Sequence, residues 1–121
     1  SSIQTGYDCS DANVCHLESL EFEDYPSILF IVVNRYSFNS SSNKNSCFII
    51  MENELRIKDR IYDHAATIYH HGEHTSLGHY TAKVVYTDGA YMYDDHKISP
   101  LDIIYKEKSK SSYLIMYLRR D

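Results

Sequence analysis

Apolar residues gather in short runs of strand length that are separated by polar segments. Ile28 to Val33 is a β-branched apolar run, typical of a strand buried on both faces. Further strands are predicted over 47–51, 60–69, 79–86, 91–93 and 113–119. Thr87-Asp88-Gly89 indicates a tight hairpin turn, because Asp-Gly tolerates positive φ angles. The pattern predicts an α+β fold that is mostly β, built on an antiparallel twisted sheet.

Two segments are expected to be helical: a short helix over 13–22 and a helical turn over 100–105. Residues 1–24 are polar and acidic, whereas 25–119 carry the predicted strands of a sheet core. No repeat and no long linker divides the 121 residues. We therefore expect a single domain over 1–121.

Charge and composition exclude some classes of function. The net charge of -5 disfavours a nucleic-acid partner, because phosphate contacts need a basic surface. The longest apolar run is too short to cross a bilayer, so no membrane partner is expected. Three cysteines cannot all pair within one chain, which favours a reducing, intracellular location over a disulfide scaffold.

His79 opens one predicted strand, and Asp94 and Asp95 close the next strand of the same hairpin. Adjacent strands can bring an imidazole and a carboxylate together, and such a pair forms the base and its orienter in a thiol hydrolase. The alternative is a buried histidine paired with an aspartate in a surface turn. Cys9 precedes the predicted helix and could be a reactive thiol. The alternative there, a free cysteine in a polar segment, is favoured by the sequence.

Four histidines, His70, His71, His74 and His79, lie within ten residues and could bind zinc or copper. Glycines lie among them, which favours a solvated loop over a preformed site. The spacing of Cys9, Cys15 and His16 lacks the paired cysteines of a zinc knuckle. The sequence therefore predicts no metal and no cofactor.

Several segments resemble the histidine box of the ubiquitin-specific proteases. The box is matched by residues 62–72, by Gly78-His79-Tyr80 with the two residues that follow, and by 91–95, which end in Asp94-Asp95. Residues 25–36 resemble the Leu-Pro-x-x-Leu strand of this family, and 113–119 resemble its closing Tyr-x-Leu-x-Tyr-x-Arg strand. The three boxes occur in the family's order.

The resemblance implies the sheet half of a papain-like fold and a role for each matched residue. His79 would be the general base, Asp94 its orienter and Asp95 a second polar residue of the site. Gly72 and Gly78 would flank the loop that receives the arginine-rich tail of ubiquitin or a ubiquitin-like protein, with Tyr80 beside it.

The chain also departs from this family. The family's Gly-Asn-Thr-Cys box, the helical half around it and its Cys-x-x-Cys pairs are missing. Three hypotheses follow: the His/Asp half of a deubiquitinase with its nucleophile elsewhere, a non-catalytic relative that binds ubiquitin or acts as a scaffold, or a minimal protease with Cys9 as nucleophile. The sequence favours a catalytically incomplete domain, and a partner protein could cover the face left by the helical half.

Overall fold

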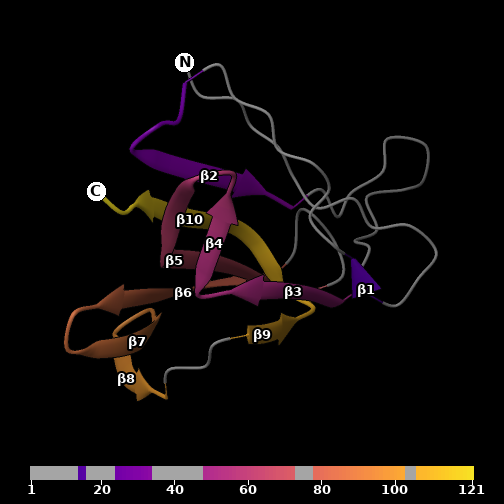
Figure 1. Cartoon of the computed structure of the whole chain (residues 1–121). Coiled ribbons are helices and arrows are strands. Elements are labelled where there is room, and N and C mark those ends of the chain that lie inside the picture. Colours follow the sequence, from indigo (N-terminus) through magenta and orange to yellow (C-terminus); the bar gives the residue numbers. More distant parts are fainter. Residues whose placement is uncertain (1–13, 16–23, 34–47, 73–77, 103–105) are drawn as a thin grey trace.

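The computed structural model describes residues 14–15, 24–33, 48–72, 78–102 and 106–121. The larger sheet has seven strands in the order β2-β10-β5-β6-β7-β8, with β4 paired to β5, and all of its pairings are antiparallel (Figure 1). Its strands are β2 (Ile28–Val32), β4 (Glu54–Ile57), β5 (Arg60–His71), β6 (His79–Tyr86), β7 (Gly89–Asp94), β8 (Lys97–Leu101) and β10 (Ser112–Arg119).

A smaller sheet of three strands, in the order β1-β3-β9, lies beside the larger one (Figure 1). It contains β1 (Val14–Cys15), β3 (Phe48–Glu52) and β9 (Lys106–Ser109). β3 pairs with β9 in antiparallel and with β1 in parallel orientation. Chain connections at β3–β4 and β9–β10 join the two sheets, since only Asn53 separates β3 from β4.

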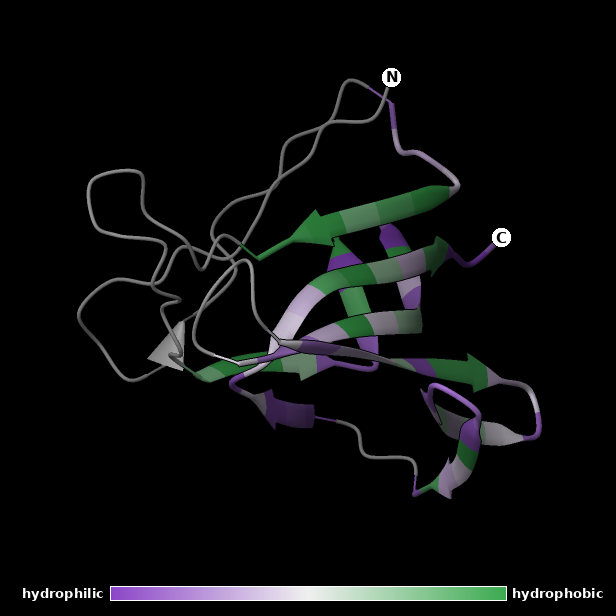
Figure 2. Cartoon of the chain, turned by 180° about the vertical axis from the view of Figure 1, so that it is seen from behind, coloured by the Kyte–Doolittle hydropathy of each residue, from purple (hydrophilic) through white to green (hydrophobic). Residues whose placement is uncertain are grey.

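The core fills the space between one face of the larger sheet and β3. Its members are buried apolar side chains from or next to five strands (β2, β3, β4, β5 and β10): Leu29, Ile31, Val33, Ile49, Met51, Ile57, Tyr62, Tyr69, Ile115 and Tyr117. β2 is apolar along its whole length (Figure 2), yet it buries only alternate side chains. Ile28 and Phe30 are 46% and 39% exposed, so the prediction that this strand is buried on both faces was wrong. An edge strand that pairs only with β10 contacts the core with one face.

The predicted mostly β, antiparallel fold is confirmed, but both helical predictions fail where the chain is described. Val14–Cys15 forms β1 rather than helix, and the rest of 13–22 lies outside the described residues. β8 extends to Leu101, and Pro100 is tolerated there because β8 is an edge strand. No helix occurs in the described part, and so none with the length and apolar character needed to cross a bilayer.

Buried tyrosines connect the core to polar partners. The hydroxyl of Tyr62 donates to the carbonyl of Pro26 at 2.7 Å, and that of Tyr117 donates to the carbonyl of Glu52 at 2.7 Å. Each ring contributes apolar area, and each hydroxyl satisfies a backbone acceptor. Tyrosine can therefore serve as a core residue at these positions without leaving a buried polar atom unpaired.

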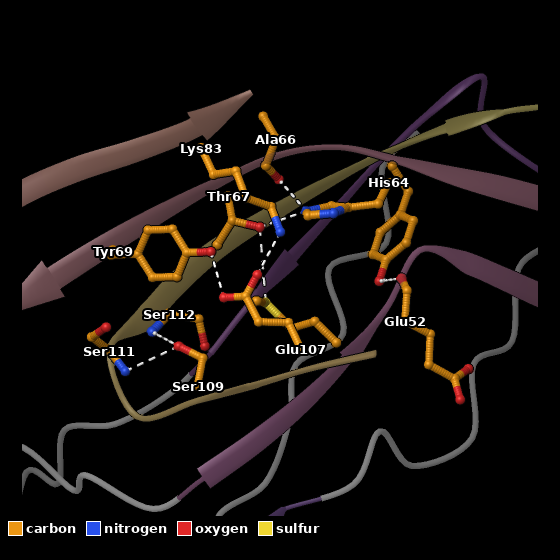
Figure 3. A network of polar contacts seen from close by, with 12 residues as sticks. Glu52, His64, Ala66, Thr67, Tyr69, Lys83, Glu107, Ser109, Ser111 and Ser112 are labelled. Carbon is orange, nitrogen blue, oxygen red and sulfur yellow. Dashed lines mark hydrogen bonds and ion pairs between the residues drawn. The ribbon is translucent and has the colours of Figure 1, made fainter. Parts of the chain in front are cut away.

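A buried ion pair fastens β9 to the larger sheet. Lys83 of β6 forms a salt bridge with Glu107 of β9 (Figure 3). The hydroxyl of Tyr69 in β5 donates a hydrogen bond to the same carboxylate at 2.6 Å. The Lys83 side chain is only 8% exposed. Beside this pair, burial and, to a smaller extent, the charge of Lys83 lower the pKa of His64 to about 4. His64 is therefore neutral at pH 7 and hydrogen bonds with the hydroxyl of Thr67 at 2.5 Å.

We expect Glu107→Ala to lower the free energy of unfolding by about 2–4 kcal/mol, because it leaves a buried ammonium and a buried phenol without their partner. Urea denaturation measures the effect. Lys106→Ala is the matched control, since Lys106 pairs with Glu52 at 3.5 Å on the surface and should cost no more than about 0.5 kcal/mol. Equal losses in the two variants would contradict a structural role for the buried pair.

Candidate functional site

The hairpin of β6 and β7 brings the predicted base and orienter together. His79 is the first residue of β6, and Asp94 is the last of β7. The imidazole Nε2 of His79 lies 2.5 Å from Oδ1 of Asp94, and both side chains are 47% exposed. Nδ1 of His79 forms no hydrogen bond with any described residue. The ring therefore has one nitrogen held by a carboxylate and the other available to a reacting group, which is the arrangement that general-base catalysis requires.

Asp94 also sets the basicity of His79. The hydrogen bond to Asp94 and its negative charge raise the pKa of His79 above its ordinary value, against a smaller opposing effect of desolvation. Asp95 adds a further, smaller rise. Because the pKa is higher in the folded state than in the unfolded state, the pair stabilises the fold most below the unfolded pKa. This contribution is lost as the pH rises through the folded pKa.

Asp95 lies in the two-residue turn between β7 and β8, with a φ of +53°. Together with His79 and Asp94 it makes the one set of three metal-ligand types that lies within 4.8 Å among the residues the structure describes. The hydrogen bond between His79 and Asp94 engages Nε2 and one carboxylate oxygen of this set. The arrangement fits a base with its orienter.

Strand alternation divides the predicted histidine cluster between two faces. His71 pairs in register with His79, and the preceding His70 pairs with Tyr80 on the opposite face. His70 is 2% exposed. A metal site shared by His70, His71 and His79 is therefore incompatible with the fold. His74 lies outside the described residues.

Gly78 is the point at which the chain enters β6, and it passes very close to the end of β5. A Cβ atom at this position would meet the carbonyl oxygen of His71 and would lie 2.5 Å from Nε2 of His70. Its φ of +155° also favours glycine. Gly72, with a φ of +130°, follows β5 on the other side of the undescribed residues 73–77. The two glycines flank residues 73–77, and their role beside a bound tail stays a prediction.

Tyr80 is 54% exposed and belongs to an aromatic group on the face opposite His79. Its ring centroid lies 4.8 Å from that of the buried His70 and 6.3 Å from that of Tyr113 in β10. The sequence pointed to Tyr80 but missed Tyr113, because β5 separates β10 from β6 in the sheet order. Cys9 lies outside the described residues, so its proximity to His79 stays a prediction.

The antiparallel sheet thus carries a paired imidazole and carboxylate on one hairpin. The family model described as ubiquitin carboxyl-terminal hydrolase matches residues 4–117, and the chain belongs to this family.

Two curated fungal relatives are similar in sequence. Ubiquitin carboxyl-terminal hydrolase 3 of Saccharomyces cerevisiae is 34% identical over 85 residues, which cover 63% of this chain and 9% of the relative. The probable ubiquitin carboxyl-terminal hydrolase 3 of Schizosaccharomyces pombe is 28% identical over 142 aligned positions, which cover 92% of this chain and 28% of the relative. The chain thus spans less than a third of the length of each.

Solved structures give the same fold. A chain of the Ubp8-Sgf11-Sgf73-Sus1 SAGA DUB module matches with a TM-score of 0.75 and 20% identity, covering 98% of this chain and 34% of that one. A chain of the yeast SAGA DUB module with a mutant Sgf73 matches with a TM-score of 0.67 and 25% identity, covering 79% of this chain and 24% of that one.

We expect Gly78→Ala to be much more destabilising than Gly89→Ala. Gly89 has a similar φ of +151°, but a Cβ atom there would meet nothing within 4 Å. Both variants carry the backbone cost of about 1 kcal/mol. Overpacking against the backbone of β5 adds about 1–3 kcal/mol to Gly78→Ala alone. Thermal and urea unfolding measure the difference, and similar values for the two variants would show that the close approach is relaxed in solution.

We expect Asp94→Asn to lower the pKa of His79, because the substitution removes the negative charge that raises it. The imidazole resonances of His79, followed by NMR from pH 4 to about 9, report this pKa. Asp95→Asn is the matched control and should give a smaller change in the same direction, since Asp95 makes the smallest contribution. A larger effect from Asp95 would mean that the wrong aspartate has been assigned as the orienter.

Proposed function

We propose that this chain provides the base half of a ubiquitin-directed thiol hydrolase, with the nucleophile supplied by another segment or another chain. The observation that carries the proposal is the His79–Asp94 pair at 2.5 Å. In the reaction, Nδ1 of His79 accepts the proton of the thiol, and Asp94 holds Nε2 and stabilises the imidazolium. Membership in the ubiquitin carboxyl-terminal hydrolase family supports the proposal that the reaction is a hydrolysis.

The ligand in this proposal is the C-terminal tail of ubiquitin or a ubiquitin-like protein. Gly72 and Gly78 flank residues 73–77, and Tyr80, the residue after the base, presents an exposed aromatic ring on the opposite face of the sheet. Aromatic faces attract the guanidinium groups of an arginine-rich tail. One similar structure is the Ubp8/Sgf11/Sus1/Sgf73 SAGA DUB module bound to monoubiquitin, which matches this chain with a TM-score of 0.67 at 24% identity.

A covering protein or segment is the second partner in the proposal. Ile28 and Phe30 of β2 and Leu118 of β10 expose apolar side chains on the face of the sheet that looks away from the core. Register pairing places Leu118 opposite Ile28, so the exposed side chains form a continuous stripe. A stripe of this kind is typical of a surface that another protein or another part of the chain covers.

A ubiquitin-binding or protein-interaction scaffold without cleavage is the second candidate function. The exposed apolar stripe of Ile28, Phe30 and Leu118 favours it, because such a surface can bind a partner without any chemical step. In both candidates the chain acts as one domain inside the cell. The third possibility, catalysis by Cys9, stays a prediction from the sequence.

The binding part is tested by titrating the isotopically labelled chain with ubiquitin and following its NMR spectrum. We expect Tyr80→Ala to weaken binding at least tenfold, because stacked aromatic contacts contribute about 1–3 kcal/mol. Tyr86→Ala is the matched control, since Tyr86 is similarly exposed at the other end of β6 and should bind as the wild type does. Equal weakening in both variants, or no binding by the wild type, would contradict the proposed ligand.

The catalytic part is tested with ubiquitin that carries a C-terminal electrophile, read by intact mass. We expect the chain alone to form no adduct, because the nucleophile comes from elsewhere in this proposal. An adduct that is lost in Cys9→Ala would replace the proposal with an autonomous protease that uses Cys9.

A further inference from the structure

A second imidazole lies beside the proposed base. His71, the last residue of β5, pairs in register with His79, the first residue of β6. Their ring centroids are 6.3 Å apart, and the ring planes differ by 29°. The sequence analysis treated His71 as one of several loop histidines, whereas the structure places it in the sheet and on the same face as the base.

The ring of His71 is held by neighbours on both strands. Its Nε2 lies 2.8 Å from Oγ1 of Thr81, and its ring stacks on Tyr69 at a centroid distance of 6.3 Å with an interplanar angle of 21°. Tyr69 in turn is fixed by its hydrogen bond to Glu107. Tyr69, His71 and His79 therefore form a row of rings along one face, with the buried ion pair at its inner end.

A cavity of about 490 Å³ lies next to His71 on this face. Its walls include Tyr69, His71, Lys83, Met92, Leu101 and Glu107. His71 thus stands between the cavity and the base. His71 is exposed, so its ring can exchange protons with solvent.

We propose that His71 is a positioning residue for His79: it limits the orientation of the neighbouring imidazole, and its own protonation opposes protonation of His79. The catalytic meaning of this role rests on the proposed function of His79. The interaction between the two rings does not depend on that function, and it is testable in the chain alone.

The electrostatics around the two rings come from all the elements packed against them. The titratable or charged groups there are His70 and Tyr69 from β5, Lys83 from β6, Asp94, Asp95 and His96 from β7 and its turn, Lys97 from β8, Asp102, and Glu107, Lys108 and Lys110 from β9 and the turn after it. Lys83 and Glu107 neutralise each other in their ion pair. Asp94 contacts His79 directly, whereas His71 contacts the neutral hydroxyl of Thr81.

The two rings interact through space because they lie on one face of the sheet. A positive charge on either imidazole opposes a positive charge on the other, so the uptake of the second proton by the pair is disfavoured. Coulomb's law in water at the 6.3 Å separation gives a mutual effect of about half a pKa unit.

The test is an NMR titration of the histidine rings in the wild-type chain and in His71→Gln at low ionic strength. Glutamine keeps a hydrogen-bonding group for Thr81 but carries no charge. We expect the titration of His79 to lose its coupled component and to follow a single-site curve in this variant. In the wild type, we expect the two rings to titrate in coupled steps that deviate from single-site curves.

His96→Gln is the matched control, because it makes the same chemical change in the turn between β7 and β8. We expect it to leave the coupled titration of His79 unchanged. Independent single-site curves in the wild type, or a coupled His79 curve that persists in a folded His71→Gln variant, would overturn the inference. If His71→Gln does not fold, the wild-type curves alone decide it.

Thr81→Val separates positioning from charge, since it removes the hydroxyl that holds the His71 ring but retains the histidine. We expect the ring-current shifts of His79 to change in this variant. Unchanged shifts would overturn the positioning role. The outcomes are also distinct from those of the ubiquitin experiment: coupled rings without ubiquitin binding would refute the proposed function only, and binding without coupling would refute this inference only.

Discussion

The register between β5 and β6 is the constraint on which the site depends. Side chains alternate along a strand, so a shift of one residue would move every functional group to the opposite face of the sheet. In the observed register His79 lies opposite His71, and Tyr80 lies opposite His70. The base and the proposed tail-binding tyrosine therefore occupy opposite faces because they are consecutive in the sequence.

Two features at opposite ends of the pairing hold this register. At one end, Gly78 fits against the last residues of β5 only because it has no Cβ atom. Further along, Lys83 faces Thr67 and reaches Glu107, which also accepts the hydroxyl of Tyr69. A slipped register would leave the ammonium of Lys83 buried without its carboxylate. Because the net stability of a buried ion pair is small, its greater effect is to penalise such alternatives.

The sequence predicted strands well wherever apolar residues recur in runs or alternations. β6 was predicted over its observed bounds, and β10 to within one residue of its start. β4, β8 and β9 were missed because their residues are largely polar. These segments form strands because they pair with neighbouring strands, and their own sequence pattern does not predict it. The helix expected over 13–22 failed at Val14–Cys15 for the same reason, since pairing with β3 outweighs local propensity.

The site could be predicted as far as it depends on one hairpin. Thr87-Asp88-Gly89 fixes a short turn, and a short turn fixes which residues of β6 and β7 are neighbours. His79 and Asp94 follow from that geometry. Tyr113 could not be found in the same way, because its position requires the order β10-β5-β6 across the sheet. His71 was missed because the strand predicted over 60–69 ends two residues before β5 does. Contacts between strands distant in sequence are set by the whole core, and no local pattern encodes them.

The exposure of the pair explains why a covering element belongs to the proposed function. His79 and Asp94 are each 47% exposed, so water screens the charge that would stabilise an imidazolium. Exclusion of water strengthens such an interaction and prevents side reactions. The exposed stripe of Ile28, Phe30 and Leu118 gives a covering element apolar area to bury. Docking on that stripe, on the opposite face of the sheet, would thus provide binding energy at a surface remote from the base. A part of the same element that extends to the face of His79 would bring a thiol to Nδ1 and reduce the access of water. In this view the sheet alone has the geometry of a base, and the covering element supplies the environment in which that base acts.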